Sequence, residues 1–137
     1  MSYTVNTTQL GAYSVAITGG TATSGGGVAA IPNPEGVDLI IRDWAFYPQT
    51  NSTGAANLTI GTAASGTVAA NSLITTTAIA AAAGSVYTGI VGGTVAAQNV
   101  TTTNKWGSAD YINVTASASA AGFSALLFIK YFRMTTD

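Results

Sequence analysis

The feature that most constrains the fold is a strict alternation of apolar and polar side chains over residues 111–118, Tyr-Ile-Asn-Val-Thr-Ala-Ser-Ala. A period of two residues is typical of a β-strand with one buried and one solvated face. The next residues, Ala120–Gly122, end in a glycine suited to positive φ and predict a short hairpin loop. The returning run from Phe123 to Met134 is apolar on both faces. The C-terminal part of the chain is therefore expected to be strand, turn and strand.

Further strand signals are spread along the rest of the chain. The run Val37–Tyr47 is also apolar on both faces and follows a Pro- and Gly-rich turn, and Asn57–Gly61 is a shorter alternating strand. Briefer strands are expected at residues 12–17, 73–74, 86–87 and 99–100. The alanine-rich segment 77–83 leaves a one-turn helix open, although it is too short to propagate alone. Many short strands separated by Gly, Asn and Pro turns predict an all-β antiparallel sandwich or barrel.

The length of 137 residues fits one domain. We expect residues 1–30 to form an N-terminal arm or first strand with a Gly-rich linker, and residues 31–137 to form the β-sandwich domain. Within the first part, Met1–Ile17 would be an extended arm that orders on a neighbour, and Gly19–Gly27 would be flexible. Residues 1–6 lack the basic and apolar regions of a secretory signal, so the chain is expected to remain in the cell that makes it.

Two strands with both faces apolar are unusual in a small antiparallel sandwich, where one face of each sheet usually meets water. Either loops cover the outer face or a second copy of the chain does. Charged residues make up only 7% of the chain, against about 25% in ordinary soluble domains. This depletion favours a homo-oligomer, with a closed ring as its natural form. The outer-face residues predicted to form the oligomer interface are Ile40, Trp44, Phe46, Leu126, Phe128 and Phe132.

Composition also excludes several classes of site. Cysteine and histidine are absent, which excludes disulfides, thiolate or imidazole metal sites, and Ser-His or Cys-His nucleophile pairs. The basic side chains are Arg42, Lys105, Lys130 and Arg133, too few to build a basic face for nucleic acid. The longest apolar stretch is too short to cross a bilayer, so no membrane partner is expected.

The acidic side chains are weak candidates for chemistry. Asp38 and Asp43 are expected on opposite faces of one strand, and Glu35 reads as a turn carboxylate. One alternative is a glycosidase-like acid pair of Glu35 and Asp38. Another is a calcium site, either at the turn of residues 33–35 or beside Asp110. We therefore expect no catalytic residues, no metal and no cofactor.

Two aromatic residues are candidate surface contacts. Trp106 lies in the polar segment 104–110, where it is either a contact residue or a plug that anchors the loop, and Tyr47 ends an apolar strand.

An ordered set of short motifs resembles the small structural proteins of tailed bacteriophages. The motifs are NPEGVDLII at residues 33–41, STGAANLTIG at 52–61, KWGSADYINVTAS at 105–117, AAGF at 120–123 and LFIKY at 127–131. The resemblance covers about 100 residues, and residues 1–30 match nothing that we can name.

The resemblance implies a jelly-roll-like sandwich in a virion protein that assembles as a homotrimer. The expected function is capsid decoration, as a cement protein that stabilises a phage head beside the major capsid protein. The alternative is a head- or tail-fibre module that binds a host receptor or glycan, and a polysaccharide hydrolase is a third interpretation. The protein would be made in the host cytoplasm and would lie on the capsid surface of the virion.

Overall fold

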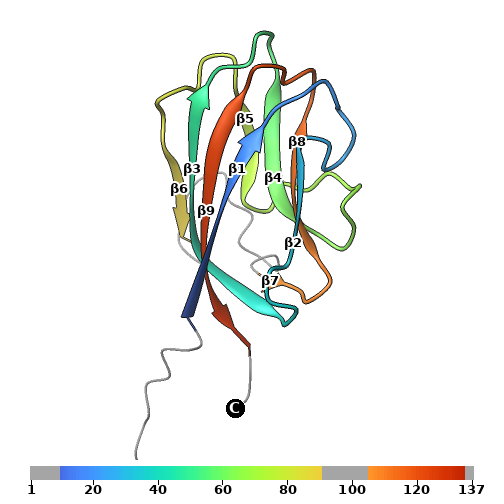
Figure 1. The fold of residues 1–137 in the computed structure, drawn as a ribbon, viewed down its shortest axis with the longest axis vertical. Helices are drawn as coiled ribbons and strands as arrows, with labels where there is room; N and C mark the ends of the chain where they lie inside the picture. Colours follow the sequence, from blue (N-terminus) through green and yellow to red (C-terminus); the bar gives the residue numbers. More distant parts are fainter. Residues whose placement is uncertain (1–9, 91–104, 135–137) are drawn as a thin grey trace, which may run out of the picture.

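The computed structural model describes residues 10–90 and 105–134, and these residues form strands and turns without a helix. No segment of this part of the chain is therefore a helix able to cross a membrane. The strands are β1 (Leu10–Thr18), β2 (Ala29–Pro32), β3 (Leu39–Thr50), β4 (Asn57–Ala63), β5 (Ile74–Ala78), β6 (Tyr87–Ile90), β7 (Lys105–Trp106), β8 (Tyr111–Ala116) and β9 (Ser124–Arg133). The all-β expectation is confirmed (Figure 1).

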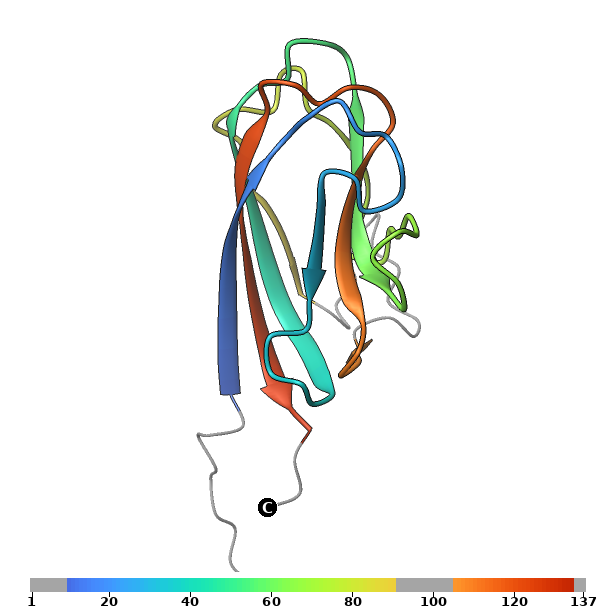
Figure 2. The ribbon, with the colours of Figure 1, turned by 45° about the vertical axis from the view of Figure 1, so that its right-hand side comes forward.

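Two antiparallel sheets pack face to face, as the two layers in Figure 2 show. One sheet has the order β1-β9-β3-β6 with β7 beside β3, and the other has the order β2-β8-β4-β5. With the two-residue β7 set aside, the pairs β1·β9, β2·β8, β3·β6 and β4·β5 are nested, first strand with last and so inward. This nesting is the jelly-roll-like order of a double-sheet sandwich.

The expected hairpin at residues 120–122 is wrong. β8 and β9 belong to different sheets, so their connection crosses from one layer to the other. Gly122 does adopt positive φ, 84°, as the turn signal indicated. The prediction of a turn with positive φ at Gly122 was thus correct. The flanking strands β8 and β9, however, pair with strands that are distant in sequence.

The core fills the space between the two sheets. Leu39, Phe46 and Leu127 from one sheet and Ile60 and Ile112 from the other are fully buried there. Aromatic contacts extend this packing, with the ring centroids of Phe46 and Phe123 6.2 Å apart. A single contiguous core of this kind is what holds two stacked sheets together.

The N-terminal strand belongs to the sandwich. All nine residues of β1 pair with β9 in continuous register, from Leu10 opposite Phe132 to Thr18 opposite Ser124. Of the two alternatives for the N-terminal part, an arm or a first strand, the structure shows the strand for residues 10–18, so the arm interpretation does not hold for residues 10–17. Residues 1–9 lie outside the described residues. The boundary expected between residues 30 and 31 falls inside β2.

The glycine run after β1 is a packed loop rather than a linker. Gly26 adopts φ +68°, and its N–H donates a 2.9 Å hydrogen bond to Thr115 Oγ1. A Cβ at this residue would lie 2.2 Å from the Gly66 carbonyl oxygen. Glycine is needed here because the backbone of one loop touches the backbone of another.

The remaining strand predictions are mostly confirmed. The structure has strands at all the expected positions except residues 99–100, which lie outside the described residues. The short strands β2 and β7 were not expected. The alternative of a helical turn at residues 77–83 is wrong, because β5 ends at Ala78 and a non-helical turn follows.

Candidate interaction surface

β9 separates its two apolar faces as the alternation predicts. Ala125, Leu127, Ile129 and Tyr131 point into the core and are at most 3% exposed. The intervening residues Leu126, Phe128, Lys130 and Phe132 point away from the other sheet. Phe128 is 43% exposed and Phe132 39% exposed, high values for phenylalanine in the middle of a sheet.

β3 is also apolar on both faces of its sequence pattern, but it contains a β-bulge at Arg42. Its register with β9 shifts between Ile41, which lies opposite Tyr131, and Asp43, which lies opposite Lys130. The extra residue reverses the phase of the strand, so Leu39 and Ile41 before it, and Trp44 and Phe46 after it, all face the core.

This bulge corrects part of the predicted oligomer interface. Trp44 is 6% exposed and Phe46 is fully buried inside their own subunit, so neither lies on the outer face. Uniform alternation along the strand was the wrong assumption. Ile40 and Tyr47 do lie on the outer face, where both are half-buried. The participation of Ile40, Leu126, Phe128 and Phe132 in an oligomer stays a prediction.

The side of the β1-β9-β3-β6 sheet that points away from the other sheet is therefore a broad apolar surface, which we call the outer face. β1 contributes Leu10, which is 46% exposed, together with small side chains. β9 contributes Leu126, Phe128 and Phe132, and β3 contributes Ile40, Ala45 and Tyr47. Exposed apolar patches of this kind mark interaction sites in soluble proteins.

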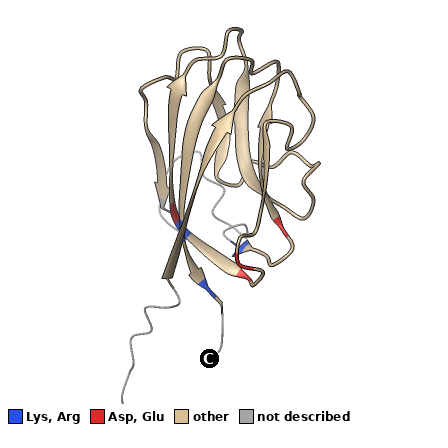
Figure 3. Ribbon diagram, in the orientation of Figure 1, with Lys and Arg blue, Asp and Glu red and all other residues tan. Residues whose placement is uncertain are grey.

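Three charged residues interrupt the outer face. The Arg42 guanidinium lies over the Phe132 ring at 5.7 Å, a cation–π contact. Asp43 lies opposite Lys130 in the register of β3 and β9. Beside them is a shallow depression of about 390 Å³ lined by Leu10, Gly11, Ala12, Arg42, Lys130 and Tyr131. The charges of the described residues gather toward the half of the sandwich where β9 ends (Figure 3).

The opposite sheet turns a polar face outward. The outward residues of β8 are Tyr111, Asn113 and Thr115, and Thr59 of β4 lies opposite Thr115. The loop after β4 covers part of this face, and Asn113 Nδ2 donates to the carbonyl oxygens of Ser65 and Val68 in that loop. Asn113 is buried as a result. Within residues 10–90 and 105–134 the two sheets thus differ, because one is polar and partly covered by its own loop, whereas the other is apolar and uncovered.

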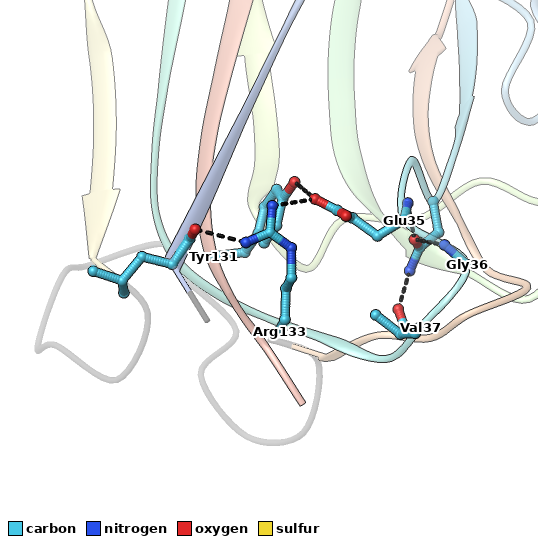
Figure 4. Close-up of polar contacts among 7 residues, drawn as sticks. Glu35, Gly36, Val37, Tyr131 and Arg133 are labelled. Carbon is cyan, nitrogen blue, oxygen red and sulfur yellow. Dashed lines mark hydrogen bonds and ion pairs between the residues drawn. The ribbon is translucent and has the colours of Figure 1, made fainter. Parts of the chain in front are cut away.

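A polar cluster ties the β2–β3 loop to the end of β9 (Figure 4). Glu35 Oε2 accepts hydrogen bonds of 2.6 Å from both the Tyr131 hydroxyl and Arg133 Nη2. Arg133 Nη1 also donates a 2.7 Å bond to the Leu10 carbonyl oxygen. One guanidinium therefore joins the start of β1, the end of β9 and the β2–β3 loop.

These contacts shift the titration of the cluster. The hydrogen bond from Arg133, followed by that from Tyr131, lowers the pKa of the Glu35 carboxyl. Burial, together with the bond to Glu35, raises the pKa of Tyr131 to about 12. The cluster is thus an ionised carboxylate held by a neutral phenol and a guanidinium throughout the neutral range.

A second ion pair lies nearby, between Lys105 Nζ and Asp38 Oδ2 at 3.1 Å. The Ser108 N–H donates to Asp38 Oδ1 at 2.9 Å, and this bond, followed by that from Lys105, lowers the pKa of Asp38. Glu35 therefore pairs with Arg133, whereas Asp38 pairs with Lys105. In residues 10–90 and 105–134, no three acidic side chains come together in an arrangement that could hold a metal ion.

Trp106 is a core residue, which corrects its prediction as a surface contact. It is fully buried between Tyr13 and Tyr131, with ring centroids 6.2 Å and 6.4 Å away in edge-to-face geometry. Its indole N–H donates to the Asp110 carbonyl oxygen at 3.3 Å. The alternative of an anchoring plug is the one that the structure supports, and Tyr47 keeps partial exposure on the outer face.

Asn33, which the sequence places in a Pro- and Gly-rich turn, connects that turn to the segment around Trp106. Its Nδ2 donates to the carbonyl oxygens of Val37, Trp106 and Gly107 at 2.8–2.9 Å. Its Oδ1 accepts from the N–H groups of Glu35 and Gly36. The signal was available, because Asn before a Pro-x-Gly turn favours an Asx-type bond to the following backbone.

No family model matches the chain, and no curated protein matches it. Among solved structures, a chain of the cyanophage Pam1 capsid asymmetric unit aligns at a TM-score of 0.41 and 20% sequence identity. The alignment covers 90% of this chain and 83% of that chain.

Proposed function

We propose that this chain is a structural component of a tailed-phage virion, a homotrimeric decoration protein that stabilises the capsid. The observation that carries the proposal is the outer face, a wide apolar surface in a chain with very few charges. The motif series of the sequence supports the phage assignment, and the jelly-roll-like strand order agrees with the fold that this resemblance implies.

The outer face is large enough for a stable contact. Strands about 4.8 Å apart and about 3.3 Å per residue give β1, β9, β3 and β6, with nine, ten, twelve and four residues, a plane of roughly 550 Å². Side-chain relief increases the accessible area, which is then comparable to the about 800 Å² per partner of a standard interface. Contacts with other copies, or with the shell that the protein decorates, would remove Phe128 and Phe132 from water.

Light scattering tests self-association. We expect the protein to have a mass of about 41 kDa, three times the 13.6 kDa of one chain. Phe128→Asp should reduce the mass to that of one chain without changing the circular dichroism spectrum, because an unpaired carboxylate in an apolar contact costs several kcal/mol. Thr76→Asp adds the same charge to the opposite sheet and should leave the trimer intact.

A monodisperse wild-type monomer at micromolar concentration would contradict the trimer, as would a Phe128→Asp protein of unchanged mass.

The proposed role in the virion must be tested on phage heads. Heads made without this protein should lose DNA at a lower temperature than decorated heads, because a ligand bound only to the intact shell stabilises it. Adding purified protein should restore the difference, and Phe128→Asp should restore it less well. Equal rupture of bare and decorated heads, with adsorption to host cells lost instead, would favour the fibre alternative. That alternative has lost Trp106 as a contact residue and keeps Tyr47.

A further inference from the structure

In the part of the chain that the structure describes, β1 forms an open edge of its sheet. Among the described residues it pairs only with β9, along nine residues without a register shift. It contains neither a charged residue nor a proline. Natural sheets usually protect long edges with charges, prolines, bulges or short strands, because an open edge is a template for another strand.

The other sheet edges carry such protection. β2 and β6 have four residues each, and β2 ends in Pro32. β5 has five residues, and its register with β4 shifts between Leu58 and Ile60. Among the described strands, β1 is therefore the long edge without a protecting device.

The hydrogen-bond phase shows which residues of β1 face this edge. The Gly19 N–H donates to the Phe123 carbonyl oxygen, which continues the β1–β9 ladder by one residue pair. Because such pairs alternate, odd-numbered residues of β1 bond β9 and even-numbered ones turn their N–H and C=O outward.

We infer that the β1 edge pairs with β1 of a second copy, antiparallel and about a twofold axis at Ser14. In this register the outward-facing residues meet one another, with Ser14 opposite Ser14 and Ala12 opposite Ala16. Each such pair exchanges both of its N–H···O bonds. No like charges oppose each other, because the strand has none.

Side chains on the inner face of β1 also match in this register. Tyr13 would lie opposite Val15, an aromatic and β-branched pair that stabilises antiparallel strands. Both side chains are only half-buried in one subunit, although both point toward the core. Gly11 would lie opposite Ile17, and the space beside Gly11 on the inner face is already filled by the Tyr131 ring of its own chain. A second copy therefore supplies the backbone partners and covers the two exposed edges.

This contact forms through the backbone edge of β1, whereas the proposed trimer contact forms through side chains of the outer face, to which the even-numbered side chains of β1 also belong. A twofold edge contact would join trimers to one another, which suits a protein that covers a shell. Its test is therefore built to give an answer whether or not the trimer forms.

Cysteine trapping tests the register, because the chain has no native cysteine. Ser14→Cys places two thiols on opposed residues with Cα atoms about 5.5 Å apart, within disulfide range. Ala12→Cys is the matched control: it is equally accessible, but its copies would be displaced by four residues, about 14 Å. Ser14→Cys should form a disulfide-linked dimer at least about tenfold faster than Ala12→Cys under mild oxidation on non-reducing gels.

A mixture of Ala12→Cys and Ala16→Cys chains, one of them carrying a mass tag, should link to each other faster than either links alone. Repeating the Ser14→Cys reaction in a Phe132→Asp chain, which puts the charge on the outer face opposite Leu10 and not beside Ser14, should preserve the dimer, because the edge bonds join backbone groups. Equal, slow oxidation of Ser14→Cys and Ala12→Cys would overturn the inference, whatever the mass of the wild-type protein. Faster linking of Ala12→Cys would overturn the register. A β1 edge protected from hydrogen exchange only when bare heads are added would assign it to another protein's strand and also overturn the inference.

Discussion

Replacing Asn33 should show how much of the fold depends on one side chain in the β2–β3 turn. Its amide nitrogen contacts three carbonyl oxygens, on Val37, Trp106 and Gly107, but carries only two hydrogens. The three contacts therefore amount to about two full hydrogen bonds. At about 0.5–1.5 kcal/mol each, with an added cost for carbonyls left without a donor, Asn33→Ala should lower the free energy of unfolding by about 2–4 kcal/mol.

Two further variants separate the causes. Asn33→Asp keeps an acceptor for the N–H groups of Glu35 and Gly36 but places an oxygen against the three carbonyl oxygens, so it should cost more than Asn33→Ala. Asn51→Ala is the matched control. The Asn51 side chain accepts one bond, from the Ala83 N–H, at an exposed position, and its loss should cost less than about 1 kcal/mol.

Urea unfolding followed by tryptophan fluorescence measures these differences, because Trp44 and Trp106 are both buried. All variants should be compared at one protein concentration, since association adds to apparent stability. A loss below about 0.5 kcal/mol for Asn33→Ala, or an Asn33→Asp protein more stable than Asn33→Ala, would refute the reasoning.

Two other predictions concern the bulge and the polar cluster. Deleting Arg42 removes the bulge, so one half of β3 must turn its core residues outward, and circular dichroism should show no folded protein. Arg42→Ala keeps the bulge residue and should fold, with a loss of at most about 1 kcal/mol in the free energy of unfolding. The pKa of Glu35 is lowered by folding, so its contribution to stability is present above its ordinary pKa and is lost as pH falls through the folded value. The thermal midpoint should therefore fall less steeply in acid for Glu35→Gln than for wild type, although Asp38 keeps part of the slope. Folding raises the pKa of Tyr131 from 10.0 to about 12, so its contribution is present at neutral pH and is lost as pH rises across that interval. Absorbance at alkaline pH should show this late-titrating tyrosine in wild type and not in Tyr131→Phe, and an identical titration of the two proteins would contradict the assignment.

The sequence alone predicted the fold class and most strands, because the side-chain period of a strand is a local property. The alternation at residues 111–118 became β8, and the two faces of β9 were assigned correctly, with Leu127 inside and Phe128 outside. The scarcity of charge likewise pointed to an apolar outer surface, which the structure has over β1, β9 and β3.

Tertiary structure decided which strands pair and which side of β3 faces the core. Leu10 pairs with Phe132 near the other end of the chain, so the local strand signal at residues 12–17 could not show that this strand belongs to the sandwich and not to an arm that reaches a neighbour. The bulge at Arg42 exists because β3 must keep its apolar side chains inside along its whole register with β9. The same holds for Trp106, whose polar neighbours in sequence suggested a surface, whereas its spatial neighbours Tyr13 and Tyr131 bury it. Side-chain period is set within a few residues, but burial is set by the strands that nested pairing brings together, and those are the most distant in sequence.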